Sequence, residues 1–334
     1  MRLSVVIPTK NRTESLGNAL DSVARQTLPS DTFEVVVVDN GSSKEALTAI
    51  ERYRNKFAHW QLLSEPTPGP AAARNCGVRA SSGDVILFLD DDVIADPGLL
   101  AEHLAAHTSG ETSSRLGQVV LGTVKNAWSG RESAFHWLLT RRELFHSFRF
   151  PDPNNIPFSH FYTCNVSLRR AAFVEVGGFD ESFTAAAFED AELGYRLGRA
   201  GCRIIFNPRA AIVHAPLLSF EAFADKRFRA GRALYQLVTK HPELERILLP
   251  KRWRRDSRYA LGWALKPVAS VGEQPVPASA SFILPVLGEA CWLYFEYRFW
   301  SGYRAGAMRL EPQQKAGRLV STPNNSLAPE RHDE

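Results

Sequence analysis

The sequence predicts an α/β protein with a single, mostly parallel central sheet flanked by helices, followed by a helical C-terminal extension. Short, continuous apolar runs alternate with helical stretches in the first half of the chain, which is typical of parallel strands covered by helices on both faces. The chain has 334 residues, 44% of them hydrophobic and 23% charged. This is enough for one large globular domain with an appendage.

Strands and helices are expected to alternate up to residue 90. The expected strands share runs of Val, Ile, Leu and Phe, and cover residues 3–8, 33–40, 60–65 and 84–90. The expected helices cover residues 11–26 and 44–57 and a stretch ending near Ala80. The first of these helices repeats apolar residues with a helical period at Leu16, Ala19, Leu20 and Val23.

The second half of the pattern is less regular. A strand-like segment at 116–126 precedes a mixed stretch to about Phe161 with no clear period. A helix is expected at 189–200, with Gly201 in the position of a C-terminal cap, and a strand follows from Cys202. Beyond about Ser219 the chain becomes helical and basic, and residues 313–334 are expected to form a disordered tail.

The net charge of +4 is small for this length, so a general affinity for nucleic acid is not predicted. The charge is unevenly distributed, however. Eleven Lys or Arg residues lie between Lys226 and Arg258, against only Glu243, Glu245 and Asp256. This local excess suits contact with anionic lipid or with an anionic acceptor, and a solvated helical face is the alternative interpretation.

The four cysteines lie far apart without a Cys-x-x-Cys pair, so neither a zinc site nor a disulfide framework is indicated, and a cytoplasmic location is expected. The apolar run at the N-terminus ends at Pro8, too early for a signal peptide. Residues 281–300 contain charges that argue against crossing a bilayer, although not against lying on its inner face. Within them, Trp292, Phe295 and Phe299 could form an interfacial stripe or pack internally.

Polar residues follow three of the expected strands, where an open parallel sheet binds ligands. The most unusual is the triplet Asp90, Asp91 and Asp92, because adjacent buried carboxylates repel and need a positive species to remain ionised. Oxygen ligands favour Mg²⁺ or Mn²⁺. In an extended segment Asp90 and Asp92 would share one side, which leaves Asp91 structural or facing solvent. An acidic loop that caps the helix starting near Pro97 is the alternative.

Six ordered segments resemble family-2 glycosyltransferases with the GT-A fold. They are SVVIPTKNR, VVVVDNGSS, GPAAARNCG, GDVILFLDDD, GGFDESF and FEDAELGYRLGRAGCRIIFNPRAAIVH. The similarity extends from Ser4 to His214 and fades after about Phe220. It implies a catalytic domain over 1–220, with a nucleotide-sugar half over about 1–125 and an acceptor half over about 126–220. The basic and aromatic extension would then cover 221–312.

The resemblance also implies a donor site and a metal site. Asp39 would accept a hydrogen bond from the base, Thr9 and Arg12 would flank the nucleotide, and Asp90 would lie by the ribose and metal. Asp92 would bind Mn²⁺ or Mg²⁺ directly, together with His214, although a lone His at a strand end is often an ordinary surface residue. The full set expected at the donor nucleotide is Pro8, Thr9, Arg12, Asp39, Gly41, Arg74, Asn75, Asp90 and Asp91.

Glu189 and Asp190 match the Glu-Asp pair of the family, in which the aspartate is the general base. A helix start favours an ionised carboxylate, and a simple capping role is the alternative. Arg74 suits a grip on phosphate or an ion pair with a site aspartate. Gly177 and Gly178 are expected near the sugar or acceptor, or in a purely structural turn, and Asn165 is expected to contact a sugar.

The expected function is metal-dependent, inverting transfer of a sugar from a nucleoside diphosphate sugar to a hydroxyl. UDP-sugar is the first choice of donor, with dTDP- and GDP-sugars open, and the acceptor is a saccharide or lipid-linked saccharide of envelope or exopolysaccharide synthesis. A sugar-phosphate nucleotidyltransferase would need a glycine-rich loop after the first strand, where only Gly17 occurs. A non-catalytic Mg²⁺-dependent sugar-nucleotide-binding module would need no base such as Asp190.

Overall fold

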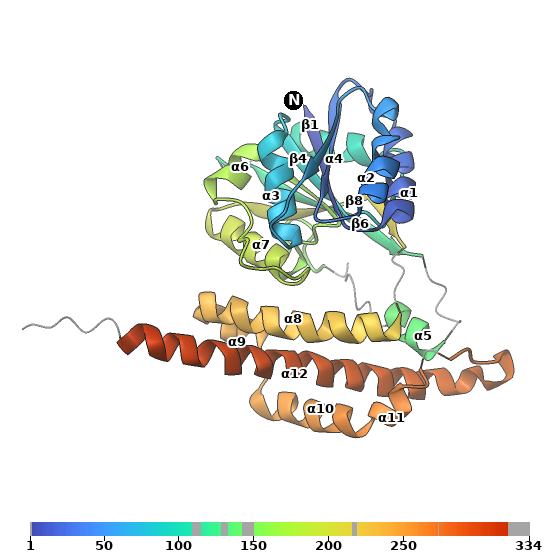
Figure 1. Ribbon diagram of the computed structural model, residues 1–334, viewed down its shortest axis with the longest axis vertical. Helices are drawn as coiled ribbons and strands as arrows, with labels where there is room; N and C mark the ends of the chain where they lie inside the picture. Colours follow the sequence, from blue (N-terminus) through green and yellow to red (C-terminus); the bar gives the residue numbers. More distant parts are fainter. Residues whose placement is uncertain are drawn as a thin grey trace, which may run out of the picture.

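The computed structural model describes residues 2–108, 115–127, 133–141, 150–215, 219–272 and 274–319 (Figure 1). An α/β domain built on one sheet lies against a layer of helices formed by the C-terminal part of the chain together with α5, Ala134–Arg141. The predicted fold class is therefore confirmed.

The sheet has the strand order β3-β2-β1-β4-β7-β6-β8-β5. The first four neighbours are parallel, β7 is antiparallel to both β4 and β6, and β5 is antiparallel to β8. The strands are β1 Leu3–Thr9, β2 Phe33–Asp39, β3 Trp60–Ser64, β4 Val85–Leu89, β5 Val93–Ala95, β6 Gln118–Asn126, β7 Asn165–Arg169 and β8 Arg203–His214.

The helices of the α/β domain are α1 Thr13–Ala24, α2 Lys44–Glu51, α3 Pro70–Ala80, α4 Leu99–Thr108, α6 Arg170–Glu175 and α7 Glu189–Arg199. Those of the second layer are α5 Ala134–Arg141, α8 Phe220–Lys240, α9 Glu245–Leu248, α10 Arg252–Ala264, α11 Lys266–Ala269 and α12 Leu284–Leu319. Short 3₁₀ turns occupy Arg54–Lys56, Phe158–His160, Pro242–Leu244 and Ala278–Ile283.

Both faces of the sheet are buried, which explains why its strands are continuously apolar. In β1, Leu3, Val5 and Ile7 join the core beneath α1 and α4. Val6, between them, joins the core beneath α3, α6 and α7. Alternate residues of a strand point to opposite faces, so a strand covered on both sides must be apolar throughout.

Most expected boundaries agree with the structure to within a few residues, and the exceptions have physical reasons. The helix expected over 44–57 ends at Glu51, and a 3₁₀ turn follows. The strand that begins near Cys202 continues through Pro208 to His214, because a register shift against β6 between Gly122 and Thr123 accommodates the proline. Helix α12 runs to Leu319, residues 320–334 lie outside the described residues, and the disordered tail expected from residue 313 stays a prediction.

The second layer is held together by close packing of α8 against α12. A Cβ atom added to Gly231 would lie 1.8 Å from the carbonyl oxygen of Phe299, and one added to Gly302 would lie 1.9 Å from that of Phe228. Phe295 and Phe299 are buried in this layer and Trp292 packs against it, so the interfacial interpretation of the stripe is wrong. These rings are core residues of the helical region.

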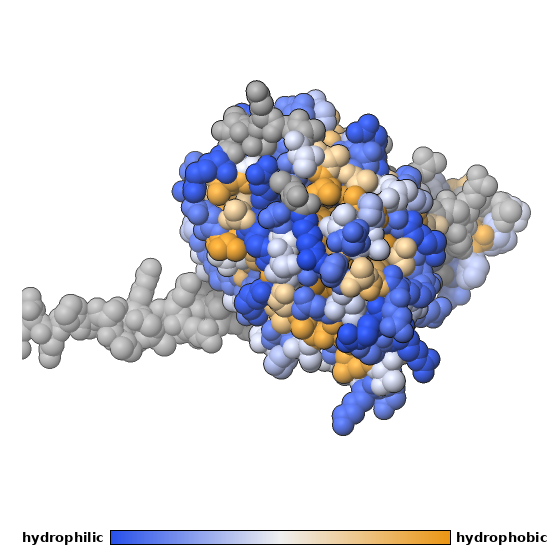
Figure 2. Space-filling view, turned by 90° about the horizontal axis from the view of Figure 1, so that it is seen from above, coloured by the Kyte–Doolittle hydropathy of each residue, from blue (hydrophilic) through white to orange (hydrophobic). Residues whose placement is uncertain are grey.

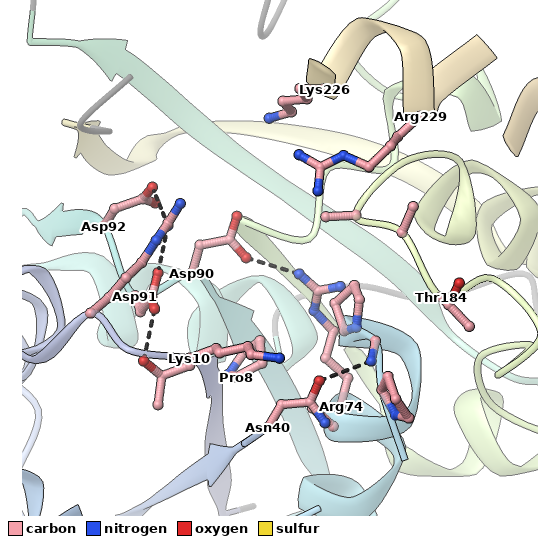
Figure 3. A pocket seen from close by; sticks show the side chains of 18 of the residues that line it. Pro8, Lys10, Asn40, Arg74, Asp90, Asp91, Asp92, Thr184, Lys226 and Arg229 are labelled. Carbon is pink, nitrogen blue, oxygen red and sulfur yellow. Dashed lines mark hydrogen bonds and ion pairs between the residues drawn. The ribbon is translucent and has the colours of Figure 1, made fainter. Parts of the chain in front are cut away.

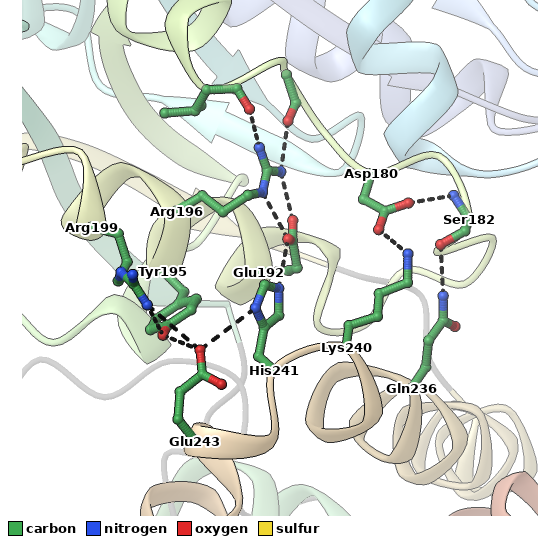
Figure 4. A network of polar contacts seen from close by, with 12 residues as sticks. Asp180, Ser182, Glu192, Tyr195, Arg196, Arg199, Gln236, Lys240, His241 and Glu243 are labelled. Atoms are coloured by element: carbon green, nitrogen blue, oxygen red, sulfur yellow. Dashed lines mark hydrogen bonds and ion pairs between the residues drawn. The ribbon is translucent and has the colours of Figure 1, made fainter.

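A polar network joins the end of α8 to the α/β domain (Figure 4). Lys240 pairs with Asp180, Gln236 donates to Ser182, and His241 lies 3.1 Å from the buried carboxylate of Glu192 on α7. The C-terminal helices are therefore fixed to the segment that leads into α7.

The surface of the α/β domain away from the helical layer is largely hydrophilic, with smaller apolar areas between polar ones (Figure 2). None of the helices in the described part of the chain is both long enough and apolar enough to cross a bilayer.

Candidate active site

The carboxyl ends of β1, β2 and β4 open into a pocket of about 570 Å³ that α8 covers from the opposite side (Figure 3). Eight of the residues expected at the site line this pocket: Pro8, Thr9, Arg12, Arg74, Asp90, Asp91, Asp92 and His214. The prediction that the strand ends converge is thus confirmed by the geometry of the sheet.

The acidic triplet does not continue the strand, because β4 ends at Leu89 and Asp91 and Asp92 form a turn. Asp91 is only 5% exposed, accepts a hydrogen bond from Thr9 at 2.8 Å and pairs with Arg12 at 3.0 Å. The same guanidinium nitrogen of Arg12 lies 3.0 Å from Asp92. Of the two expectations for Asp91, a structural role or exposure to solvent, these contacts support the structural role. The carboxylate does not face solvent, because side-chain alternation applies only to an extended segment.

Burial raises the pKa of Asp91 to about 6, although the charge of Arg12 and the hydrogen bond from Thr9 oppose the shift. Asp92 behaves differently. Burial alone would raise its pKa, but the hydrogen bond and charge of His214, then the charges of Arg12 and Lys226, outweigh burial and lower it. Asp92 is therefore the more firmly ionised of the two carboxylates.

Strand pairing brings His214 to Asp92 across more than a hundred residues of sequence. The short strand β5 follows the triplet directly and pairs antiparallel with the end of β8, with Val93 opposite His214. As a result His214 Nε2 lies 3.3 Å from Asp92 Oδ1, and both side chains are largely buried at the pocket.

A carboxylate beside an imidazole is a donor set that Mn²⁺ and, less readily, Mg²⁺ accept. No group of three or more His, Cys, Asp and Glu side chains able to hold a metal occurs in the part of the chain that the structure describes. The two residues therefore fit a cation that takes its remaining ligands from water and from substrate phosphates. One oxygen of Asp90 already accepts a hydrogen bond from Arg74.

Arg74 connects the triplet to the start of α7. It is 3% exposed, and its guanidinium lies 2.9 Å from Asp90 and 3.0 Å from Glu189. Arg74 was expected in the pocket either as a phosphate-binding residue or in an ion pair with a site aspartate. The structure contains the ion pair, with Asp90. Through Arg74, the acidic turn after β4 and the helix that carries Asp190 form one unit.

Asp190 occupies the first turn of α7, next to the pocket but not among its lining residues. Burial, then the negative charge of Glu189, raises its pKa to about 7, while the hydrogen bond from the backbone N–H of Ala191 opposes the shift. Burial also raises the pKa of Glu189, although Arg74 opposes the effect. Asp190 remains partly exposed.

Asp39 and Gly41 shape the loop after β2. The carboxylate of Asp39 is 1% exposed and accepts hydrogen bonds from the backbone N–H groups of Gly41 and Ser42. Gly41 has a φ of 94°, which glycine adopts without strain. The contact between Asp39 and a base stays a prediction.

Three expected ligand contacts are not supported by the structure. The side chain of Asn75 is fully engaged with Phe179 and Glu181, so it holds the turn that contains Gly177 and Gly178 rather than a nucleotide. The two glycines have φ values of 80° and 72° and line a separate hollow beside Lys240 and His241. They form the structural turn of the alternative interpretation.

Asn165 is completely buried, and the expectation that it contacts a sugar is wrong. Its amide donates to the carbonyl oxygens of Thr123 and Ala210, and its Oδ1 lies 2.8 Å from Nε2 of His103. The residue joins β7, the β6–β8 register shift and α4 in the interior of the protein.

Other residues that line the pocket are Lys10, Asn40, Gly69, Thr184, Lys226 and Arg229. Lys10 and Asn40 belong to the strand ends that were expected to converge, and the other four were not predicted. The basic character of the segment from residue 226 was visible in the sequence, but its position over the acidic triplet depends on the packing of α8.

Comparisons with known proteins agree with this geometry. The chain is 33% identical over 237 residues to validoxylamine A glucosyltransferase of Streptomyces hygroscopicus subsp. jinggangensis, covering 64% of this chain and 55% of that protein. It is 28% identical to the pre-mycofactocin glycosyltransferase of Mycobacterium tuberculosis, covering 72% and 48% of the two proteins. The chain thus spans about half the length of these relatives.

Two solved structures share the fold. TarS 1–349 of S. aureus in complex with UDP superposes with a TM-score of 0.52 at 21% identity, covering 92% of each chain. Mannosyltransferase PcManGT of Pyrobaculum calidifontis in complex with GDP-Man and Mn²⁺ gives 0.53 at 20% identity, covering 95% and 88%. The predicted GT-A architecture is confirmed. Because the sequence model of glycosyl transferase family 2 matches residues 4–177, the chain belongs to that family.

Proposed function

We propose that this protein is an inverting glycosyltransferase that moves a sugar from a nucleoside diphosphate sugar to a hydroxyl acceptor with the help of a divalent cation. One observation carries the proposal. The contacts Asp90–Arg74–Glu189 tie the acidic turn to the helix start that bears Asp190. A leaving-group site and a candidate base are thereby held as one unit, on elements far apart in sequence.

Asp190 is the proposed general base. In its ionised form it takes the proton from the acceptor hydroxyl as the new bond between that oxygen and the anomeric carbon forms. The bond from the anomeric carbon to the diphosphate breaks at the same time, and its electron pair leaves with the diphosphate. The raised pKa of about 7 matches a base that works near neutral pH.

Asp92 and His214 are the proposed protein ligands of Mn²⁺ or Mg²⁺. A cation held there would offset the negative charge that the departing diphosphate gains. Arg12, which bridges Asp91 and Asp92 on the protein side, keeps the two carboxylates together in the free enzyme.

The nucleoside is proposed to lie along the ends of β1 and β2, near Pro8, Thr9, Asp39 and Gly41. Family membership and the UDP complex of TarS make UDP-sugars the first donors to test, and GDP-sugars the second because of the PcManGT complex. Membership of the family also favours transfer over nucleotidyl transfer or mere binding.

The acceptor is proposed to be a saccharide carried on a lipid at the inner face of the cell membrane. Large apolar side chains are exposed in the helical region, among them Trp263 at 65% on α10 and Phe282 at 77% in the 3₁₀ turn before α12. Arg252, an exposed basic residue, lies on the same helix as Trp263. Exposed aromatic and basic side chains together suit an anionic lipid surface.

A thermal-shift panel tests the central proposal. The protein is heated with UDP-, GDP- and dTDP-sugars in the presence of Mn²⁺, with Mg²⁺, and with a chelator. Stabilisation by at least one donor that disappears with the chelator is expected, because ligand binding to the folded state raises the unfolding temperature. No shift with any donor and cation would overturn the proposal.

A further inference from the structure

Two cations from the C-terminal helical region reach into the pocket. Lys226 and Arg229 lie one turn apart on α8, and both side chains point from that helix toward the acidic triplet (Figure 3). The match to the family covers residues 4–177 only, so neither residue belongs to the part of the chain that the family comparison describes.

The other arginines of the pocket are already used by protein carboxylates. Arg12 pairs with Asp91 and Asp92, and Arg74 pairs with Asp90 and Glu189. Arg229, by contrast, is exposed and makes no ion pair or hydrogen bond with any residue in the described ranges. Its charge is available for a ligand.

The charge balance of the pocket points to an anionic ligand. Its lining contains five cationic side chains (Lys10, Arg12, Arg74, Lys226 and Arg229) and three carboxylates (Asp90, Asp91 and Asp92), an excess of two positive charges. Glu189, behind Arg74, offsets part of that excess. Without Lys226 and Arg229 the lining would hold as many carboxylates as cations. The capacity for an anion therefore comes from α8.

The position of α8 is fixed before any ligand arrives. Ser219 caps its start by accepting a hydrogen bond from the N–H of Ala222, and Lys240 and His241 join its end to the α/β domain. Phe183, next to the pocket-lining Thr184, packs with Leu234 and Leu237 of the same helix. A cation pair held this way needs little reordering to bind a phosphate group.

We propose that Lys226 and Arg229 form an anion-binding pair that holds the diphosphate of the sugar-nucleotide donor and keeps hold of it as the leaving group. This rests on the proposed function. Lys226 and Arg229 line the same pocket as Asp92 and His214, which is where the phosphates of a cation-bound donor would lie. Guanidinium and ammonium groups make strong, charge-assisted hydrogen bonds to phosphate oxygens.

The test compares Lys226→Gln, Arg229→Gln and the double variant with the native protein. Calorimetry measures the affinity of each for UDP, GDP and dTDP with Mn²⁺, and for the matching monophosphates and nucleosides. Arg232→Gln is the matched control, because Arg232 is exposed on the same helix but does not line the pocket. Arg229→Lys keeps the charge.

We expect the double variant to bind its nucleoside diphosphate at least tenfold more weakly than the native protein does. Its affinity for the monophosphate should fall less, and its affinity for the nucleoside should not change. Arg229→Lys should retain most of the affinity, and Arg232→Gln should match the native protein. Diphosphate affinity within twofold of native in the double variant would overturn the inference and leave the proposed function standing. The inference would also be overturned if the double variant raised only the KM for the acceptor. The pair would then bind a phosphate of the acceptor.

If the native protein binds none of the nucleoside diphosphates, the proposed function fails, and this inference fails with it. Misfolding cannot imitate the expected result, because the nucleoside affinity and the thermal unfolding of the variants are measured alongside. Arg229→Gln removes an exposed side chain with no partner among the described residues, so it should unfold at the native temperature.

Discussion

The guanidinium of Arg74 donates a hydrogen bond to Glu189 at 3.0 Å, across 115 residues of sequence and with both side chains almost wholly buried. The second arm of the guanidinium reaches Asp90 at 2.9 Å. This contact connects the two halves of the site, so its removal should affect the stability of the fold as well as function.

Arg74→Met should destabilise the protein by about 3 kcal/mol, because it leaves the carboxylate of Glu189 buried without its partner. Urea unfolding at pH 7 measures the loss. The double variant Arg74→Met/Glu189→Gln should recover part of it, since no buried charge remains. Arg79→Gln is the control: Arg79 is 63% exposed and pairs at the surface, so less than about 1 kcal/mol is expected. Equal losses for Arg74 and Arg79 would contradict the prediction.

Asp190→Asn should lower the rate of sugar transfer at least about a hundredfold, as expected when a general base is lost. The affinity for the donor should stay within about twofold of the native value. Glu175→Gln, an exposed substitution remote from the pocket, is the control and should transfer at the native rate. Transfer by Asp190→Asn near the native rate would place the base elsewhere.

The rate of transfer should depend on pH through the Glu189–Asp190 pair. With a pKa of about 7, Asp190 is mostly protonated in mild acid and cannot accept a proton. We expect kcat/KM to rise about tenfold per pH unit on the acid side and to level off above pH 7. Rates measured between pH 5 and 9 with a saturating cation provide the check, and a flat profile would count against Asp190.

The same shift predicts a gain in stability for Asp190→Asn. The pKa of Asp190 is higher in the folded state than its ordinary value of 3.8, so the protonated form stabilises the fold. That contribution is complete below about pH 4 and is lost as the pH rises through about 7. Asp190→Asn, which stays neutral, should therefore be more stable than the native protein at pH 8, and the difference should shrink by pH 5.5. Urea unfolding at both pH values tests this, and a constant difference would be inconsistent with the raised pKa.

Asp91 and Asp92 should be separable by experiment. Asp92→Asn and His214→Ala should weaken Mn²⁺-dependent binding of a nucleoside diphosphate by tenfold or more, because each removes a proposed ligand. Asp91→Asn should keep the Mn²⁺ dependence of binding. It should, however, weaken the contacts that Asp91 makes with the guanidinium of Arg12 and the hydroxyl of Thr9. Calorimetry with and without Mn²⁺ distinguishes the two outcomes, and loss of the cation requirement in Asp91→Asn would reverse the assignment.

Contact with a membrane is tested by flotation with vesicles. The native protein should bind vesicles rich in phosphatidylglycerol and leave neutral phosphatidylcholine vesicles free. Trp263→Ser/Phe282→Ser should bind several-fold less. The control, Ile247→Ser, alters a side chain that is 67% exposed on α9, a different element from those that carry Trp263 and Phe282. Equal binding by all three proteins, or binding by none, would remove this part of the proposal.

Local sequence predicted the strands and most helices well because both signals are short-range. The run VILFL is typical of a buried strand, and the Pro at the start of α3 and the acids at the start of α7 mark helix N-termini. Where local rules ended, prediction failed. Asp91 was placed by strand alternation although the strand had already stopped, and Asn165 was assigned to a sugar although it fills a polar gap in the interior.

By itself, then, the sequence determined an α/β sheet and placed the acidic triplet at its carboxyl edge, because both follow from residue periodicity. The GT-A type was implied by the resemblance of its ordered motifs to a known family. Only the tertiary structure decided the partners of those residues. Pairing of β5 with β8 set His214 beside Asp92, and burial set the pKa of Asp190. Packing of α8 brought Lys226 and Arg229 over the pocket. Such contacts join segments that no local pattern relates.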